Sequence, residues 1–313
     1  MTNPAHTAAT REGILVIGAG ELGSSVLGAL SRRTDREADL RTLALMVRRS
    51  TSAEARQRAA DLAAEGIAVV EVDVAEASET ELAAAMGRHH TVICCLGMTA
   101  GPGTQLKLAR AALAGGVPRY FPWQFGMDYD VVGRNSPQDL FDEQLDVRDL
   151  LRGQNATEWV IVSTGMFTSF VFEPDFGVVD LRTNTVNALG SWDNEVTLTT
   201  PEDIGTLTAE IVHARPRIAN QIVYVAGDTI SFNGLADVVD EVRGTSVTRT
   251  EWPLPYLLDE LERHPTDAMR KYHAVFALGK GIAWPKATSF NAIRGIPTTD
   301  AATWARAHLG RRT

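Results

Sequence analysis

One glycine-rich segment near the N-terminus constrains the fold of this 313-residue chain more than any other feature. The segment 18–23 reads Gly18-Ala19-Gly20-Glu21-Leu22-Gly23. A strand-length apolar run, 14–17, precedes it, and a helix-length stretch with Val26 and Leu30 follows it. The first glycine permits a tight turn, the second lets a pyrophosphate approach the backbone, and the third lets helix and strand pack closely. The segment therefore predicts a dinucleotide site at the helix N-terminus; a glycine-rich turn without a ligand is the alternative.

The same alternation of strand and helix continues along the chain. Apolar runs lie at 14–17, 42–47, 67–72 and 91–96, and helix-length intervals follow them at about 21–33, 52–65, 79–87 and 104–115. Each interval is long enough to cross over and return to a parallel strand. A strand near 118–122, a helix near 137–153 and a strand near 157–162 continue the pattern. We predict an α/β fold, a Rossmann doubly wound parallel sheet with a smaller C-terminal substrate lobe.

The regular alternation of strand and helix patterns ends after residue 163, and this change suggests the domain boundaries. We assign 1–11 to a loose tail and 12–163 to the nucleotide-binding Rossmann domain. Strands near 195–199 and 221–225, around a helix at 201–213, predict that the segment 195–231 returns to this domain. The segments 164–194 and 232–313 are irregular or helical, and we assign them to the substrate lobe.

Composition argues against several classes of partner. The net charge is −9 and the basic residues are spread along the chain, so we expect no nucleic-acid partner. No apolar run approaches the roughly 20 residues of a membrane span, and the N-terminus has no apolar signal region, so we expect a cytoplasmic protein with no membrane partner. The histidines show no ligand-pair spacing, so we expect no metal. A small-molecule ligand fits this composition best. The sequence leaves open whether the protein forms a homodimer.

The two cysteines, Cys94 and Cys95, are adjacent in the fourth predicted strand. Neighbouring residues on a strand point to opposite faces, so these two cannot form an ordinary disulfide bond. We interpret them as reduced core residues.

The end of the second predicted strand bears on the choice of cofactor. It reads Arg48-Arg49 where an NAD site usually carries an acidic residue. Two guanidinium groups suit the 2′-phosphate of NADP(H), because a planar fork matches phosphate oxygens; a solvated strand end is the alternative. Further contacts with adenine and ribose are expected at the ends of the third and fourth strands, at Asp73, Leu96, Gly97 and Met98.

The segment 117–128 resembles a known family. It reads Val117-Pro118-Arg119-Tyr120-Phe121-Pro122-Trp123-Gln124-Phe125-Gly126-Met127-Asp128, similar to the "RF-P-S-E-F-G-x-D" segment of the isoflavone reductase-like and NmrA-like family of atypical short-chain dehydrogenases. Family segments are also resembled at 105–116, 159–172, 274–280 and 295–304. The resemblance implies an NADP(H) domain with a substrate lobe. It also implies either an NADPH-dependent reductase of aromatic compounds such as isoflavones, phenylcoumaran benzylic ethers and lignans, or a non-catalytic redox sensor.

One departure from the family affects the mechanism. Family reductases carry a lysine three residues before an [IV]-R pair, which is Val147-Arg148 here, so Gln144 takes the lysine position. Gln144 shares one helix face with Leu140 and Leu151, which predicts that it points inward. Its amide either orients the nicotinamide ribose or a substrate oxygen, or is satisfied by backbone groups.

A glutamine cannot serve as a general acid, so another group must supply the proton. Tyr129 and His273 are candidate catalytic residues because their segments are expected to flank the cleft; a core or surface role is the alternative for each. The resemblance places the nicotinamide-contacting loop at Thr164-Gly165-Met166. An aromatic substrate wall, with plain core packing as the alternative, is expected from Trp123, Phe167, Phe170 and Phe172.

These observations support three hypotheses for function. The leading one is an NADPH-dependent reductase that transfers hydride to a conjugated or benzylic carbon of a small aromatic substrate. The second is a non-catalytic NADP(H) sensor, which the missing lysine favours. The third is an isomerase or lyase that uses the dinucleotide without net oxidation.

Overall fold

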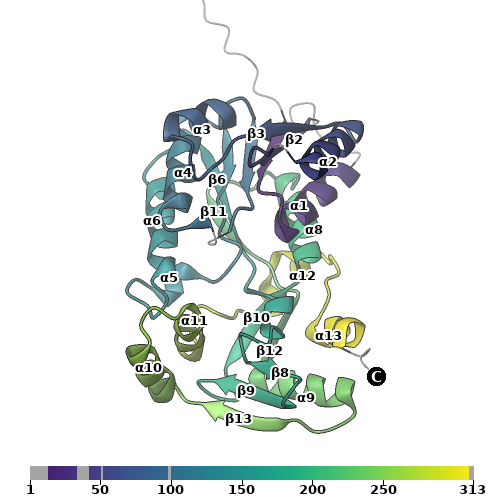
Figure 1. Cartoon of the computed structure of the whole chain (residues 1–313), viewed down its shortest axis with the longest axis vertical. Coiled ribbons are helices and arrows are strands. Elements are labelled where there is room, and N and C mark those ends of the chain that lie inside the picture. The colour runs from purple at the N-terminus through teal and green to yellow at the C-terminus, as the bar shows by residue number, and fades with distance from the viewer. Residues whose placement is uncertain (1–12, 34–41, 51, 98–99, 310–313) are drawn as a thin grey trace, which may run out of the picture.

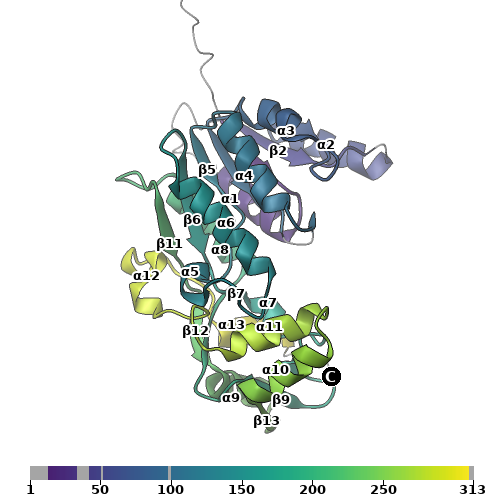
Figure 2. The same ribbon diagram turned by 90° about the vertical axis from the view of Figure 1, so that its left-hand side faces the viewer.

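A computed structural model describes residues 13–33, 42–50, 52–97 and 100–309. The predicted tail at 1–11 and the cofactor candidate Met98 lie outside these residues. Figures 1 and 2 show two parts stacked along the long axis of the molecule: a large sheet between layers of helices, and a smaller part with short strands and helices.

The large sheet has seven parallel strands in the order β11-β6-β5-β4-β1-β2-β3. They are β1 Ile14–Ile17, β2 Leu43–Val47, β3 Ile67–Glu71, β4 Thr91–Cys94, β5 Arg119–Phe121, β6 Glu158–Ser163 and β11 Gln221–Tyr224. Strands covered on both faces read as continuous runs of Val, Ile and Leu, and β1 is one such strand. The strand order reverses between β4 and β1, and a ligand crevice forms at such a point.

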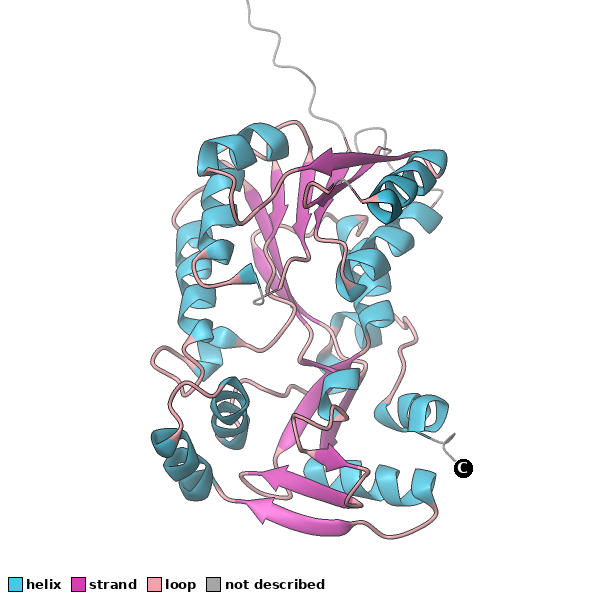
Figure 3. Ribbon diagram, viewed as in Figure 1, coloured by secondary structure: helices cyan, strands magenta, loops and turns pink. Residues whose placement is uncertain are grey.

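Helices cover both faces of this sheet (Figure 3). They are α1 Glu21–Arg32, α2 Ala53–Ala64, α3 Glu79–Met86, α4 Thr104–Ala114, α6 Leu140–Arg152 and α8 Pro201–Val212. Alternate residues of β1 face opposite layers: Val16 packs with α1 and α8, and Leu15 packs with α3, α4 and α6. The predicted Rossmann doubly wound fold is therefore confirmed.

A buried arginine joins β5 to the end of α8. The guanidinium of Arg119 donates to the carbonyl oxygens of Val212 and Ile218, at 2.7 Å in both cases. A cation is favoured there because the last carbonyls of a helix have no partner within the helix. Burial lowers the pKa of Arg119 to about 10, so the group stays charged at neutral pH.

The smaller part is built on two three-stranded sheets. One has the order β12-β10-β7, formed by β7 Met166–Phe167, β10 Glu195–Thr199 and β12 Asp228–Ser231. The other has the order β13-β9-β8, formed by β8 Val179–Asp180, β9 Thr185–Leu189 and β13 Thr248–Trp252. The helices are α5 Tyr129–Val132, α7 Thr168–Val171, α9 Phe232–Arg243, α10 Leu254–Arg263, α11 Ala268–Ala277, α12 Phe290–Ile293 and α13 Ala301–Leu309, with a 3-10 helix at Lys286–Thr288.

The segment 195–231 divides between the two parts, which corrects its predicted return to the large sheet. The helix α8 packs on α1, and β11 extends the large sheet beside β6, as predicted. The strand β10 instead pairs with β12 and β7, and its Val196 and Leu198 fill the core of the smaller part. An alternating strand pattern specifies a buried face but does not specify which sheet provides the partner.

The two cysteines lie in different cores, on opposite faces of the large sheet. Cys94 packs with α3 and α4, and Cys95 packs with α1. Both are buried and free, which confirms the prediction of reduced core thiols. Burial raises the pKa of Cys94 to about 11, so its thiol stays protonated at neutral pH.

We expect neither cysteine to react with iodoacetamide in the native protein at neutral pH, and both to react after unfolding in guanidinium chloride. The reactive thiolate is scarce and the side chains are covered. Mass spectrometry of the two samples measures this. Rapid modification of Cys95 in the folded protein would contradict its assigned burial.

Candidate cofactor cleft and active site

The glycine-rich segment forms the turn between β1 and α1. Gly18 has a φ of +100°, which disfavours other residues. A Cβ at Gly23 would lie 1.9 Å from the carbonyl oxygen of Gly18, whereas a Cβ at Gly20 would meet nothing within 4 Å. The N-cap of α1 has no side-chain hydrogen bond, so the first N–H groups of the helix have no side-chain acceptor. The turn therefore presents a helix N-terminus that can bind an anion.

A cavity of about 330 Å³ opens beside this turn. Gly18, Arg48, Asp73 and Leu96 line it, from the ends of four neighbouring strands. The Asp73 carboxylate accepts a hydrogen bond from the N–H of Ala75 at 3.1 Å, which holds the side chain at the edge of the cavity. The fold thus brings together the predicted contacts of the four strand ends. We call this cavity the cofactor cleft.

The adjacent arginines Arg48 and Arg49 lie on different sides of their strand end. Arg48 lines the cofactor cleft and a neighbouring cavity of about 440 Å³, which Ser52 and Arg58 also line. Arg49 lines a different cavity with Arg88, beside α3, which adjoins the cofactor cleft at Asp73. Successive residues of an extended segment point in opposite directions, and this explains the separation. Arg58 was missed from the sequence, because it is one of several arginines in a helix-length segment with no motif to single it out.

An apolar pocket of about 400 Å³ adjoins the end of β4. Its lining residues are Gly97, Trp123, Phe125, Gly126, Met127, Tyr129, Phe141, Gly165, Met166, Phe167, Phe170, Met269, Tyr272 and Phe276. None of the described residues that line it is charged. We call it the inner pocket. It contains the predicted Trp123, Phe167 and Phe170, and it meets the cofactor cleft where Gly97 follows Leu96.

Several other predicted site residues lie outside both the cofactor cleft and the inner pocket. Phe172 stacks on Trp304 with ring centroids 4.8 Å apart, because residues two apart on the short helix α7 face different directions. The Nε2 atom of His273 lies 2.6 Å from the carbonyl oxygen of Phe176, and His273 does not line the inner pocket. Thr164 is buried, and its carbonyl oxygen accepts from Thr199 at 2.7 Å.

Comparison with known proteins identifies the family. The NmrA-like family model matches residues 10–284. This chain belongs to the NmrA-like family. A Gibberella moniliformis protein described as an NmrA-like family domain-containing oxidoreductase is 46% identical over 294 residues, which cover 92% of this chain and 95% of that protein.

Two solved structures share the fold of this NmrA-like protein. An isoflavone reductase superposes with a TM-score of 0.76 over 95% of this chain and 99% of its own, at 18% identity. An NADPH-dependent quinone oxidoreductase from Escherichia coli, in complex with NADPH, gives a TM-score of 0.71 over 95% of this chain and 100% of its own, at 20% identity.

The described residues of this NmrA-like protein also bear on two further features, a membrane-spanning helix and a metal site. Among them, no helix combines the length and the apolar character needed to cross a membrane. The same residues form no group of three or more His, Cys, Asp and Glu side chains arranged to hold a metal ion.

Gln144 is buried on α6, as its helix face predicts. Its backbone oxygen accepts from the side-chain amide of Gln124 at 2.8 Å. Its own side-chain oxygen is buried and has no hydrogen-bond partner among the described groups. It does not line the inner pocket. The amide is therefore not part of the described wall of the inner pocket.

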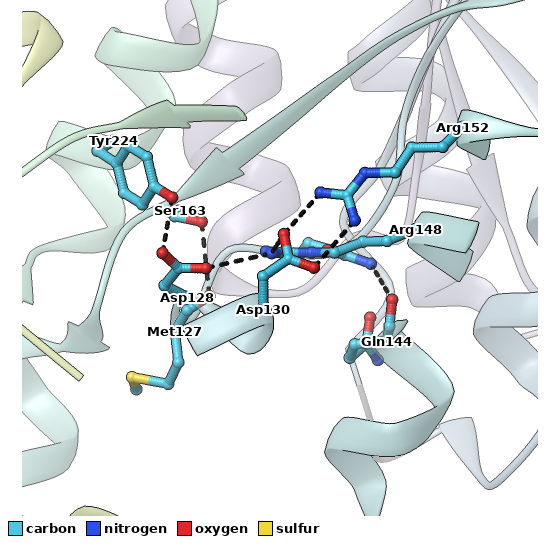
Figure 4. A network of polar contacts seen from close by, with 9 residues as sticks. Met127, Asp128, Asp130, Gln144, Arg148, Arg152, Ser163 and Tyr224 are labelled. Atoms are coloured by element: carbon cyan, nitrogen blue, oxygen red, sulfur yellow. Dashed lines mark hydrogen bonds and ion pairs between the residues drawn. The ribbon is translucent and has the colours of Figure 1, made fainter. Parts of the chain in front are cut away.

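A buried arginine on α6 organises the loop after β5 (Figure 4). The side chain of Arg148 has no exposed surface. Its Nε donates to Gln124 at 2.7 Å, and its Nη1 lies 2.7 Å from Asp130 and 3.3 Å from Asp128. The guanidinium carbon also lies 5.2 Å from the ring centroid of Tyr129. One side chain thus ties α6 to four residues of the loop that borders the inner pocket.

The same network reaches the edge of the large sheet. The hydroxyl of Tyr224, on β11, donates to the Asp128 carboxylate at 2.7 Å. Burial and this hydrogen bond raise the pKa of Tyr224. Arg152 binds the outer side of Asp130 at 2.6 Å, and this hydrogen bond holds the pKa of Asp130 below its usual value.

Tyr129 brings a hydroxyl to the aromatic wall of the inner pocket. Its ring packs edge-on against Phe141 with centroids 4.9 Å apart. Burial raises the pKa of Tyr129, so the hydroxyl stays protonated at neutral pH. Tyr272, on α11, lines the same pocket. The pocket therefore carries neutral hydrogen-bonding groups on two of its walls.

We expect Arg148→Met to lower the free energy of unfolding by about 3–5 kcal/mol, because it removes one partner of a buried ion pair. Arg152→Met is the matched control: it also removes an Asp130 contact, but its side chain is 39% exposed, so we expect a loss of at most about 1 kcal/mol. Urea unfolding followed by circular dichroism measures both. Equal losses would contradict the organising role of Arg148.

Proposed function

We propose that this protein is an NADPH-dependent reductase that transfers hydride to a conjugated or benzylic carbon of a small aromatic substrate, of the isoflavone or phenylcoumaran reductase type. One observation carries the proposal: a cofactor cleft with a free helix N-terminus and an arginine meets an uncharged aromatic pocket at the end of β4. A dinucleotide that extends from the cleft past Gly97 brings its nicotinamide to the pocket.

The cleft suits the phosphates of NADP(H). The turn at Gly20 leaves room for a pyrophosphate. Arg48 and Arg58, with Ser50 and Ser52, surround the neighbouring cavity and offer donors for a 2′-phosphate. The NADPH complex of the related fold from Escherichia coli supports the same cofactor here.

The inner pocket suits a planar, neutral substrate. Trp123, Phe167 and Phe170 contribute rings to its wall. A charged substrate would lose its hydration without gaining an ionic partner from the described lining residues. A pocket of this size and character holds a small aromatic ligand.

Bound NADPH would supply the hydride. The residues of the chain bind and orient the two reactants and exclude water, which accounts for much of the rate in such reactions. Tyr129 holds a proton on its phenolic oxygen at the pocket wall and is our candidate proton donor. Neither His273 nor Gln144 is among the described residues that line this pocket.

A second candidate function is a non-catalytic NADP(H) sensor. It is favoured by the sequence resemblance, which implies that Gln144 takes the place of the family's lysine, and by the absence of Gln144 from the described lining of the inner pocket. NADPH oxidation across a panel of isoflavones, benzylic ethers and aromatic enones separates the two candidates. Turnover of any member supports the reductase, whereas tight NADPH binding without turnover across the panel supports the sensor.

We expect Arg48→Ala to weaken NADPH binding roughly 10- to 100-fold, because a hydrogen bond to a charged group contributes about 1.5–3 kcal/mol. NADH binding should change little, since NADH lacks the 2′-phosphate. Arg49→Ala is the matched control, because Arg49 faces a different cavity, and we expect it to leave NADPH affinity near the wild-type value. Isothermal titration calorimetry measures all three proteins. A larger loss of NADPH affinity in Arg49→Ala than in Arg48→Ala would assign the 2′-phosphate contact to Arg49 instead of Arg48.

We expect Tyr129→Phe to lower kcat by about 100- to 10,000-fold, the usual contribution of a positioned proton donor. NADPH affinity should stay close to the wild-type value, because Tyr129 lies outside the cofactor cleft. Tyr272→Phe removes the hydroxyl of a second residue that lines the pocket, and we expect it to lower kcat by less than about tenfold. Steady-state kinetics provides the comparison. Wild-type turnover in Tyr129→Phe would remove Tyr129 from the mechanism.

A further inference from the structure

A second pocket borders α11 on the helix face next to the one that lines the inner pocket. It has a volume of about 310 Å³, and we call it the outer pocket. Its lining residues are Asp175, Trp252, Tyr256, Leu257, Glu260, Asp267, Met269, Arg270 and His273. Met269 is the one described residue that lines both pockets.

The spacing of residues on α11 explains this arrangement. Tyr272 and Phe276 follow Met269 at three and seven positions, so all three share the helix face that borders the inner pocket. Arg270 and His273 lie on the neighbouring face and border the outer pocket. The ring of Phe176 also packs between the two linings, 4.5 Å from the ring of Phe170 and 5.3 Å from that of His273. Met269, in the first turn of α11, is shared by the linings of the two pockets.

The Met269 side chain is suited to act as a movable wall between the inner and outer pockets. A methionine side chain is unbranched, and its three rotatable bonds let it adapt to its surroundings. It is only partly buried and packs against the core of the smaller part. Shortening this side chain therefore removes a wall without cutting a buried hydrogen bond.

The outer pocket differs from the inner pocket in its chemistry. Trp252 and Tyr256 provide aromatic surface, and three carboxylates, from Asp175, Glu260 and Asp267, provide acceptors. Arg270 is the one arginine or lysine among the described lining residues, and it lies 3.3 Å from Glu260. Glu260 also pairs with Arg263 at 2.8 Å, and Asp267 accepts from the N–H of Arg270 as the N-cap of α11. The lining still has more carboxylates than cations, which disfavours an anion and favours a neutral group that donates hydrogen bonds.

We propose that Met269 determines which substrates this protein accepts. Its side chain confines the wild-type protein to compact aromatic substrates; a shorter side chain joins the pockets and admits a hydroxyl-bearing arm into the outer one. The aromatic ring of such a substrate stays in the inner pocket. This inference rests on the proposed function for the identity of the ring.

The test compares Met269→Ala with wild-type protein, using three ligands that differ only in their arm: an isoflavone, its O-glucoside and its O-glucuronide. Calorimetry in the presence of NADP⁺ gives each dissociation constant, so the readout does not depend on turnover. We expect the glucoside to gain about tenfold or more in affinity relative to the isoflavone, equivalent to about 1.4 kcal/mol. The glucuronide should gain less than about threefold, because its carboxylate meets an acidic pocket.

Two further variants control for packing and location. Met269→Leu keeps most of the side-chain volume, and we expect wild-type preferences. Met269→Ala combined with Tyr256→Ala removes an aromatic wall of the outer pocket alone, and we expect the glucoside gain to disappear. Met269→Val serves as a second shortened variant if the alanine protein unfolds, and we expect it to show a smaller gain in the same direction.

If Met269→Ala changed the affinities for the isoflavone and its glucoside by the same factor, Met269 would not determine which substrates are accepted. An equal gain for the glucoside and the glucuronide would overturn the assigned chemistry of the outer pocket. Failure of the proposed reductase function gives a different result: the ligands would bind with the expected preferences, and NADPH would not be oxidised.

Discussion

The hydrogen bonds and ion pairs of the buried Arg148 guanidinium hold the segment that borders the inner pocket. A charge without exposed surface is stable only when it is paired and hydrogen-bonded. Arg148 finds its partners in the segment 124–130, while its Nη2 is buried without a hydrogen-bond partner among the described groups. The same loop provides Tyr129 and other walls of the inner pocket, so the geometry of the pocket follows from the need to neutralise one arginine.

The carboxyl ends of the parallel strands divide the chemistry between two adjoining cavities. The cofactor cleft combines a free helix N-terminus with Arg48, and both favour an anion. The inner pocket beyond Gly97 has an aromatic and uncharged wall, completed from the smaller part by α11. Exclusion of water from such a pocket strengthens the electrostatic interactions inside it. Through α11, the smaller part therefore lines the inner pocket, whereas the residues that line the cofactor cleft come from the large sheet and the loops that follow its strands.

Much of the fold was predictable from the sequence, whereas the site was predictable only in part. The strands and helices of the large sheet follow from local apolar patterns, and the glycine turn follows from spacing within six residues. The partner of β10 did not follow, because an alternating strand fits more than one sheet. Phe167 and Phe170 lie in the inner pocket as predicted, but Phe172 packs on Trp304, since α7 turns it away.

The sequence by itself determined the Rossmann fold, the turn at Gly18 and the membership of the NmrA-like family, because these depend on residues that are close together along the chain. Only the tertiary structure decided that Arg48 faces the cleft and Arg49 does not, and that Arg148 holds the pocket loop. It also decided that Met269 lies between two cavities. Each of these depends on the direction of a side chain relative to segments far away in the sequence, which packing alone settles.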